Sequence, residues 1–423
     1  MLNDSSHLTG PRLPWAGKQV RTEQVESELS HLWRMSADNV RTSQNINVRT
    51  SVLNLVVCVP NVESAQRASA LIRDLSSTHI ARVTILILDS NAPDMVAAWI
   101  TTRSFPVISD VTRHTFEQIT LMANGSAVRS IEHIAQPLVK PDLPVYLWWL
   151  NDPPNDSAVF AALSKLSNRL IVDSSSFTTP EESIRALATL VQAFPESSLS
   201  DLNWGRITPW RELVAQFFDA AEYRPYLAGI NTIEIEHAAA PFAQQTQTEQ
   251  GDVSPNATCA LLLAAWLKTR LNWHYSSTSM HDEDAHTSDT GAYIWHMQRN
   301  TGSLPISSVN ANGSRPSGKV GSRSQASLHI RPRVRSDMRP GSLCMVRMTG
   351  TVGNKRAVFT INREDDPNHV LTSVALEQEQ RPQRTVSMAA THNVSALLHD
   401  ELKIMNRDHL YEETLQEVQE LLS

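Results

Sequence analysis

The chain has 423 residues, of which 41% are hydrophobic and 19% are charged. These proportions are typical of a soluble globular protein, and the length is sufficient for two or three domains of roughly 150 residues each. The 37 basic and 44 acidic side chains give a net charge of -7. This mild acidity argues against nucleic acid as a partner.

No segment of the sequence has the pattern of an export signal or a membrane span. The first twenty residues contain prolines and polar residues, without an apolar run of signal-peptide length. The longest mainly apolar stretch, residues 257–267, is too short to cross about 30 Å of hydrocarbon, and Lys268 and Arg270 follow it. The sequence therefore predicts a cytoplasmic protein that does not bind membranes.

Three cysteines, Cys58, Cys259 and Cys344, are far apart in the sequence, and each lies among apolar residues. Their odd number and their spacing indicate neither a disulfide framework nor a CxxC metal site. We predict three unreactive core thiols. Redox sensing remains an alternative, and it would require an exposed thiolate with a low pKa.

Residues 1–45 are rich in Ser, Thr, Asn, Arg and Gln and contain few periodic apolar positions. Because such a segment buries little apolar surface, burial does not offset the entropy that ordering would cost. We therefore predict a mobile N-terminal tail over residues 1–45, with one short helix near residues 25–33.

Residues 46–175 alternate between strand and helix patterns. The predicted strands, several of them nearly continuous apolar runs, lie at residues 52–59, 83–88, 113–121, 145–150 and 169–173. Runs of this kind are typical of parallel strands that are covered on both faces. The predicted helices lie at residues 64–75 and 126–139. This alternation predicts an α/β domain with a doubly wound parallel or mixed sheet.

Residues 176–423 have a different pattern, which predicts an α+β domain with an antiparallel meander and C-terminal helices. The predicted helices lie at residues 180–194, 209–219, 255–271, 394–405 and 409–422, and Ser254 is the expected N-cap of the third. The predicted strands lie at residues 232–236, 328–335, 343–349 and 356–361. Residues 275–327 are rich in Ser, Gly, Asn, Asp and His, and we predict a disordered surface insertion there.

Motifs that carry chemistry are weak in this sequence. Residues 313–320 match a phosphate-binding loop, but Val320 replaces the hydroxyl residue that would bind magnesium. The histidines and acidic residues of 274–296 have metal-ligand chemistry, but they lie in a stretch with the composition of a flexible loop. No glycine-rich turn follows the first strands, so the dinucleotide fingerprint is missing. We predict no cofactor, no metal ion and no catalytic residues.

Two sets of side chains are candidates for binding a partner. Arg331, Arg333 and Arg335 alternate with other residues along a predicted strand, so their guanidinium groups project from one face of the sheet. Such a row suits a carboxylate-rich surface or a phosphate, and a solvated outer face is the alternative. Trp204 and Trp210 are candidate interface anchors, because Trp is enriched at hot spots, with core packing as the default.

Three stretches together resemble the OpcA family, the glucose-6-phosphate dehydrogenase assembly proteins of cyanobacteria and actinobacteria. They are PLVKPDLPVYLWW (137–149), DLNWGRITPWREL (201–213) and LLLAAWLKTRLNW (261–273). Their order and spacing also agree with the family. The likeness extends from about residue 46 to the end of the chain, and residues 201–213 are the strongest match.

The resemblance implies a non-catalytic allosteric activator or assembly factor that binds glucose-6-phosphate dehydrogenase and raises its activity and substrate affinity in the oxidative pentose phosphate pathway. It also suggests a cyanobacterial source and permits a link to thioredoxin, although the unpaired cysteines do not display one. The partner-binding candidates are Trp204, Arg206, Trp210, Arg211, Arg331, Arg333 and Arg335.

Two alternatives remain open from the sequence. One is an α/β enzyme or sensor that binds a sugar phosphate or nucleotide at the strand ends near Asn61, Asp89 and Asn151, where such ligands usually bind. The other is an assembly chaperone that helps subunits associate without altering the mature enzyme.

Overall fold

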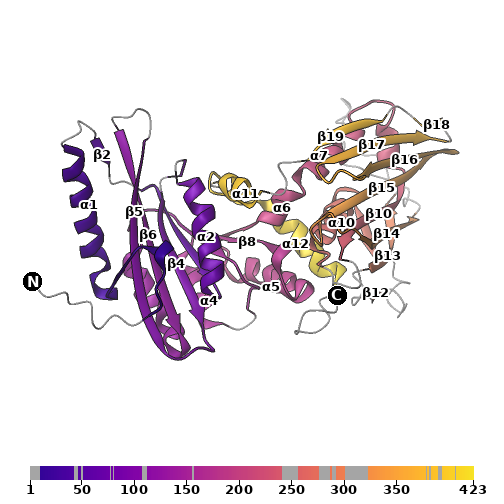
Figure 1. The fold of residues 1–423 in the computed structure, drawn as a ribbon. Helices are drawn as coiled ribbons and strands as arrows, with labels where there is room; N and C mark the ends of the chain where they lie inside the picture. The colour runs from indigo at the N-terminus through magenta and orange to yellow at the C-terminus, as the bar shows by residue number, and fades with distance from the viewer. Residues whose placement is uncertain are drawn as a thin grey trace, which may run out of the picture. The chain divides into compact units, whose positions relative to one another are not determined.

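The computed structural model describes residues 10–41, 46–48, 51–76, 78–79, 81–106, 112–154, 157–240, 256–275, 286–287, 292–300, 323–377, 379–380, 383–388, 393–404 and 406–423. The chain divides into two compact units, each built around one sheet (Figure 1). The first unit comprises residues 1–176, 189–202 and 393–409, and the second comprises residues 177–188, 203–392 and 410–423. The sequence predicted one boundary near residue 175, whereas the chain passes between the two units several times.

Nine strands among the described residues form the sheet of the first unit, in the order β1-β5-β6-β4-β3-β7-β8-β9, with β2 beside β6. They are β1 (Lys18–Val20), β2 (Ile46–Val48), β3 (Leu53–Val59), β4 (Ala81–Asp89), β5 (Met95–Pro106), β6 (Thr112–Asn124), β7 (Val145–Trp149), β8 (Arg169–Val172) and β9 (Ser198–Asp201). Neighbours from β6 to β9 are parallel, whereas β1 and β5 form an antiparallel edge. The predicted doubly wound, mixed sheet is confirmed.

The helices of the first unit are α1 (Val25–Arg41), α2 (Val62–Leu75), α3 (Ile131–Ala135), α4 (Ala158–Leu166) and α11 (Val394–Glu401). Helix α2 shows how the sequence specifies them. Asn61 begins it as the N-cap, where its side chain accepts a hydrogen bond from the Ser64 N–H at 2.9 Å. The side chains that α2 buries recur at helical spacing; they are Ala65, Ala68, Ser69, Ile72 and Leu75.

The described part of the predicted tail belongs to the fold of the first unit, which corrects the prediction of a mobile segment over these residues. β1 pairs with β5, and α1 extends well beyond the predicted short helix. The apolar residues that this segment buries are Leu13, Ala16, Val20, Val25 and Leu29. The sequence signal was weak because the burial is spread over short elements, and because the pairing strand β5 had not been predicted.

A buried ionic network also connects α1 to the sheet. Arg82 on β4, which is 3% exposed, lies 2.6 Å from the carboxylate of Glu26 on α1 and 3.3 Å from that of Glu117 on β6. Lys140 approaches Glu117 at 3.7 Å. Because a buried carboxylate is costly unless it is paired, these cations compensate for the burial of Glu117.

The helix predicted over residues 126–139 is replaced by a short α-helix between two 3-10 turns. Residues Gly125–Ser130 form the first turn, α3 follows, and Gln136–Leu138 form the second turn. Pro137 lacks an N–H group and its ring excludes a preceding helical turn, so a continuous helix does not extend through it. Strand β5 and helix α4 also lie where no element was predicted.

Ten strands in the described part of the chain form the sheet of the second unit, in the order β11-β13-β14-β10-β15-β16-β17-β18, with β12 beside β13 and β19 beside β17. They are β10 (Ile230–Ala239), β11 (Trp273–Tyr275), β12 (His286–Thr287), β13 (Ala292–Asn300), β14 (Arg323–Val334), β15 (Leu343–Val352), β16 (Lys355–Asn362), β17 (His369–Leu376), β18 (Glu379–Gln380) and β19 (Arg384–Ser387). β10 and β14 are parallel, and β15 and β16 pair in the predicted antiparallel way. The antiparallel meander continues from them into β17, where no strand was predicted, whereas β14, which was expected to precede them in the meander, lies on the far side of β10.

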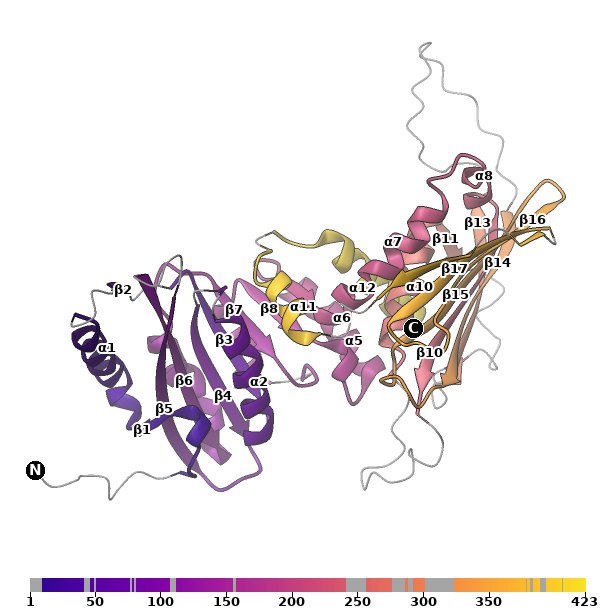
Figure 2. The ribbon, with the colours of Figure 1, turned by 45° about the horizontal axis from the view of Figure 1, so that its top comes forward.

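The helices of the second unit are α5 (Pro180–Ala193), most of which lies in this unit, α6 (Leu202–Arg206), α7 (Thr208–Phe217), α8 (Arg224–Leu227), α10 (Thr258–Arg270) and α12 (His409–Leu421). Helices α7, α10 and α12 lie on one face of the sheet, and no described helix covers the opposite face (Figure 2). The predicted N-cap Ser254 lies outside the described residues.

Part of the predicted insertion at 275–327 is strand. β12, β13 and the first residues of β14 lie within it, and Tyr293, Trp295 and Met297 are buried at alternate positions of β13. That period-two pattern was a usable signal, although the polar composition around it outweighed it. The insertion prediction for residues 301–322 lies outside the described residues.

Phe359 on β16 is the centre of an aromatic cluster between the sheet and its helices. It is 0% exposed, and its ring lies 5.0 Å from that of Phe218 and 5.4 Å from that of Phe217. Tyr223 and Tyr226 complete the cluster at 5.7 and 6.2 Å. Packing at these separations stabilises the protein beyond simple area burial.

We expect the substitution Phe359→Ala to lower the free energy of unfolding by about 3–5 kcal/mol, because it removes a buried ring and leaves a cavity. Urea denaturation followed by far-UV circular dichroism measures this change. Val352→Ala on the adjacent strand is the control, because Val352 is 37% exposed. An equal effect of both substitutions would contradict the assignment of Phe359 to the core.

Helix α11 returns the C-terminal part of the chain to the first unit. Its Leu398 and the following Leu402 belong to the hydrophobic core of that unit. His79, in the segment after α2, contacts His399 on α11, and the distance between His79 Nε2 and His399 Nδ1 is 2.6 Å. Partial burial, the His399 ring and the Lys403 ammonium lower the pKa of His79, while the Asp400 carboxylate raises it.

This lowered pKa predicts acid sensitivity. The unfolded chain, with a His79 pKa near 6.5, binds a proton more readily than the folded chain, so stability present above that pH is lost as the pH falls through the lower folded pKa. Urea midpoints at pH 7.5 and 5.5 should therefore differ less in His79→Gln than in the unsubstituted protein. His133→Gln is the control, since the His133 side chain is 76% exposed. If the urea midpoint of His79→Gln falls between pH 7.5 and 5.5 as much as that of the unsubstituted protein, His79 is not the cause of the acid sensitivity.

Candidate functional site

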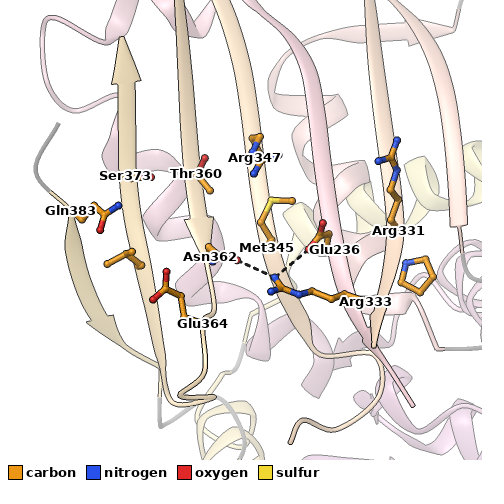
Figure 3. Close-up of a pocket in the computed structure, with 12 residues that line it drawn as sticks. Glu236, Arg331, Arg333, Met345, Arg347, Thr360, Asn362, Glu364, Ser373 and Gln383 are labelled. Atoms are coloured by element: carbon orange, nitrogen blue, oxygen red, sulfur yellow. Dashed lines mark hydrogen bonds and ion pairs between the residues drawn. The ribbon is translucent and has the colours of Figure 1, made fainter. Parts of the chain in front are cut away.

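The face of the second sheet that the helices leave open carries a hollow. We call this face, on the side of β14, β10, β15 and β16 away from α7, α10 and α12, the outer face. The hollow has a volume of about 540 Å³ (Figure 3). The residues that line it include Glu236, Arg331, Arg333, Met345, Arg347 and Asn362.

The strand register brings these residues together. Glu236 on β10 is the neighbour of Arg331 on β14 and of Met345 on β15, and Met345 is in turn the neighbour of Asn362 on β16. Alternation along each strand sends these side chains to one face, while the intervening residues are apolar and face the helices; examples are Ile235, Ile330, Val346, Phe359 and Ile361. The hollow is therefore a consequence of a sheet covered on one side only.

Two of the arginines in the hollow have anionic partners. Arg333 Nη1 lies 3.4 Å from Glu236 Oε2 and 3.3 Å from Asn362 Oδ1, as the dashed lines in Figure 3 show. Arg347 Nη1 lies 3.1 Å from Glu234 Oε2. Because all these groups are partly exposed, each pair contributes on the order of 0–1 kcal/mol to stability.

Arg335 has a different environment from Arg331 and Arg333. Its guanidinium contacts the Asp337 carboxylate at 2.6 Å and donates to the backbone carbonyls of Arg363 and Glu364. The hydrogen bond from Arg335 lowers the pKa of Asp337 to about 2. Arg335 follows the end of β14, so it fastens the turn after this strand rather than lining the hollow.

The family-like stretch 201–213 packs inside the second unit from residue 203 onwards. Trp204 is 4% exposed and Trp210 is 2% exposed, and Arg206 is also buried. Arg211, which is half-buried, lies 3.5 Å above the Trp204 ring and donates to Thr208 Oγ1 at 2.7 Å. These contacts leave little of the four candidate side chains for a partner to reach, so their role as binding residues stays a prediction.

Trp204 and Trp210 also contact distant parts of the second unit. The Trp204 ring lies 5.6 Å from that of Tyr411 on α12, and the Arg363 guanidinium lies 5.4 Å from the Trp210 ring. The stretch therefore joins α6 and α7 to both the sheet and the C-terminal helix.

Two of the three candidate ligand positions at the strand ends make local hydrogen bonds, whereas Asn151 is exposed. Asn61 caps α2, and Asp89 accepts a hydrogen bond from the Asn91 N–H at 2.9 Å. Across the described ranges, no group of three or more His, Cys, Asp or Glu side chains is placed to hold a metal ion. Residues 313–320 and all four acidic residues of 274–296 lie outside those ranges.

No helix in the part of the chain that the structure describes has the length and apolarity needed to cross a membrane.

The three cysteines are free and buried. Burial raises the pKa of the Cys58 thiol far above its usual range and raises that of Cys344 to about 11. The Cys259 thiol donates to Asn203 Oδ1 at 2.7 Å. A thioredoxin link would require one of these thiols to become exposed, and it remains untested.

The fold and the hollow define a two-unit α/β protein with an open, charged sheet face. Two family models match most of the chain. Residues 72–189 match the glucose-6-phosphate dehydrogenase subunit N-terminal domain, and residues 197–415 match the corresponding C-terminal domain. The chain thus belongs to the OpcA family of glucose-6-phosphate dehydrogenase subunits.

Relatives from cyanobacteria agree with this assignment. The chain is 35% identical over 157 residues to the OxPP cycle protein OpcA of Synechocystis sp. and 34% identical over 157 residues to that of Nostoc punctiforme. Each match covers 37% of this chain and 30% of the relative, so the chain matches less than a third of the length of these relatives.

Solved structures show a more distant likeness. An oxidoreductase from Erwinia carotovora atroseptica has a TM-score of 0.42 at 9% identity, and the match covers 87% of this chain and 96% of that one. Levoglucosan dehydrogenase in complex with NADH and levoglucosan has a TM-score of 0.40 at 13% identity, with 88% of each chain covered. A likeness at this level carries no argument about activity.

We expect all three thiols to resist modification in the folded protein, because each is buried and burial disfavours the thiolate. At pH 8, 5,5'-dithiobis(2-nitrobenzoic acid) should release less than one equivalent of thionitrobenzoate from the folded chain and about three from the chain in guanidinium chloride. The unfolded sample is the control for reagent access. Rapid reaction of a thiol in the folded protein would favour redox sensing instead.

Proposed function

We propose that this chain is a non-catalytic allosteric activator and assembly factor that binds glucose-6-phosphate dehydrogenase. In this role it raises the activity and substrate affinity of the enzyme in the oxidative pentose phosphate pathway, in the cytoplasm. The observation that carries the proposal is that both halves of the chain match domains of one dehydrogenase-subunit family.

The structure supports a binding role through the outer face of the second unit. A sheet face that no described helix covers, and that carries several charged side chains around a hollow, is available to a protein surface (Figure 3). Arg331 and Arg333 are the predicted binding residues that line this hollow. Arg has a high frequency at protein interfaces because its fork binds carboxylates in two places.

An activator of this kind acts by preferring one state of the enzyme. It raises substrate affinity only to the extent that it binds the substrate-competent conformation more tightly than the alternative. Such coupling is typically about 1–3 kcal/mol, or roughly 5–150-fold in affinity, and it is reciprocal. Glucose 6-phosphate must therefore tighten the complex by the same factor.

Titration of purified dehydrogenase with this protein tests the proposal. At subsaturating glucose 6-phosphate we expect the rate to rise and the apparent KM to fall by roughly 5-fold or more, with a complex that elutes early from a sizing column. The Kd of the complex should fall by a similar factor when substrate is present. An unchanged KM together with the absence of a complex would contradict the proposal.

The order of addition separates activation from assembly alone. An activator raises the rate of a dehydrogenase oligomer that is already assembled, whereas a pure assembly chaperone acts only when it is present during association. We expect activation in both orders. Bovine serum albumin at equal mass is the control for non-specific stabilisation of a dilute enzyme.

A further inference from the structure

Arg331 differs from the other two arginines that line the hollow and from Arg335, which follows it in the same row of alternating arginines. Arg333, Arg335 and Arg347 each contact a carboxylate, as described above. Arg331 is exposed and makes no ion pair within the described residues, although it lines the same hollow. Its guanidinium, with five N–H donors in a planar fork, is therefore available to an external acceptor.

On the opposite side of the hollow lies a carboxylate that, like Arg331, is exposed and has no ion-pair partner among the described residues. Glu364, just after β16, is exposed and its carboxylate contacts no cation in the described part of the chain. Figure 3 places Arg331 and Glu364 on opposite sides of Arg333 and Met345. The hollow therefore has one available cation at one end and one available anion at the other.

Between these two charges, Met345 forms an apolar part of the floor of the hollow, beside the charged Arg333. Met345 is 4% exposed, and its side chain lies among the polar groups that surround it (Figure 3). Met adapts its shape to irregular contacts. A surface that covers this floor excludes water, and the charge pairs at its edge then gain strength because the local dielectric falls.

We propose that the hollow is the docking point for the dehydrogenase, and that the partner surface presents a carboxylate to Arg331 and a basic side chain to Glu364. This inference rests on the proposed function, because it takes the dehydrogenase as the occupant. The positions of the two charges fix the orientation of the partner. A partner bound in the reversed orientation would place like charges against each other at both ends of the hollow, which weakens binding and disfavours that orientation.

The arrangement also separates the roles of the arginines. Arg333 and Arg347 hold the walls of the hollow through pairs with Glu236 and Glu234. Arg335 fastens the turn beyond β14. Arg331 therefore carries the specific contact, and the other three position the surface around it.

Charge reversal at the two ends of the hollow tests the proposal. We expect Arg331→Glu and Glu364→Lys each to weaken the complex with the dehydrogenase by about tenfold or more, measured by isothermal titration calorimetry. Arg356→Glu is the matched control, since Arg356 is exposed on β16 of the same sheet but does not line the hollow. It should change the Kd by less than about twofold. All three variants should keep the far-UV spectrum and thermal midpoint of the unsubstituted protein.

A second measurement distinguishes a charge contact from a general disturbance. Between 50 and 300 mM NaCl, the affinity of the unsubstituted protein should fall, because rim charges are screened, and that of Arg331→Glu should fall less. If both reversal variants bind as tightly as the unsubstituted protein, the docking point is elsewhere and the proposed function stands. If the unsubstituted protein itself does not bind the dehydrogenase, the proposed function fails.

Sedimentation velocity of the isolated protein tests whether the hollow instead binds a second copy of this chain. If Arg331→Glu changes the oligomeric state of this chain and leaves the affinity for the dehydrogenase intact, the hollow binds a second copy of the chain. That outcome would overturn the proposal.

Discussion

Within the part of the chain that the structure describes, helices cover the second sheet on one side only, and this constraint determines both its core and its open, charged face. Because side chains alternate along a strand, the covered side needs apolar residues such as Ile235 and Phe359, and the open side accepts charges such as Arg331 and Glu236. The same alternation of side chains accounts for three features: the hollow, the row of arginines on β14, and the aromatic cluster around Phe359. A substitution on the covered face therefore affects packing, whereas one on the open face changes a charged surface in contact with solvent.

Buried charges have a structural role in this protein. Arg82 and Glu117 are nearly inaccessible and compensate each other inside the first unit. Arg169, 2% exposed, donates to the Asn406 carbonyl at 2.6 Å and thereby ties the C-terminal segment to β8. In both places, a buried cation holds chain segments that are distant in sequence. The charges of the hollow differ because they remain in contact with solvent, where a new partner can still reach them.

The sequence predicts elements well where one pattern dominates, and less well where burial depends on the tertiary context. β3 and α2 were predicted within two residues, because their apolar spacing is continuous. The prediction did not reach this accuracy for four other elements, which are β1, α1, β5 and β13. Each of them depends on a partner strand or on a few buried residues in a polar stretch. The period-two row correctly placed Arg331 and Arg333 on one face. It could not show that Arg335 bends away to Asp337, or that Trp204 and Trp210 point inwards, because these depend on contacts between distant segments.

The alternation of the chain between the two units has a practical consequence. Neither unit is encoded by one continuous stretch, since residues 393–409 complete the first unit after the whole of the second sheet has been made. During synthesis, the first unit therefore lacks Leu398 and Leu402 until the strands of the second sheet have been translated. A truncation before α11 would expose apolar surface in both units at once, whereas a truncation between α11 and α12 would do so in the second unit alone.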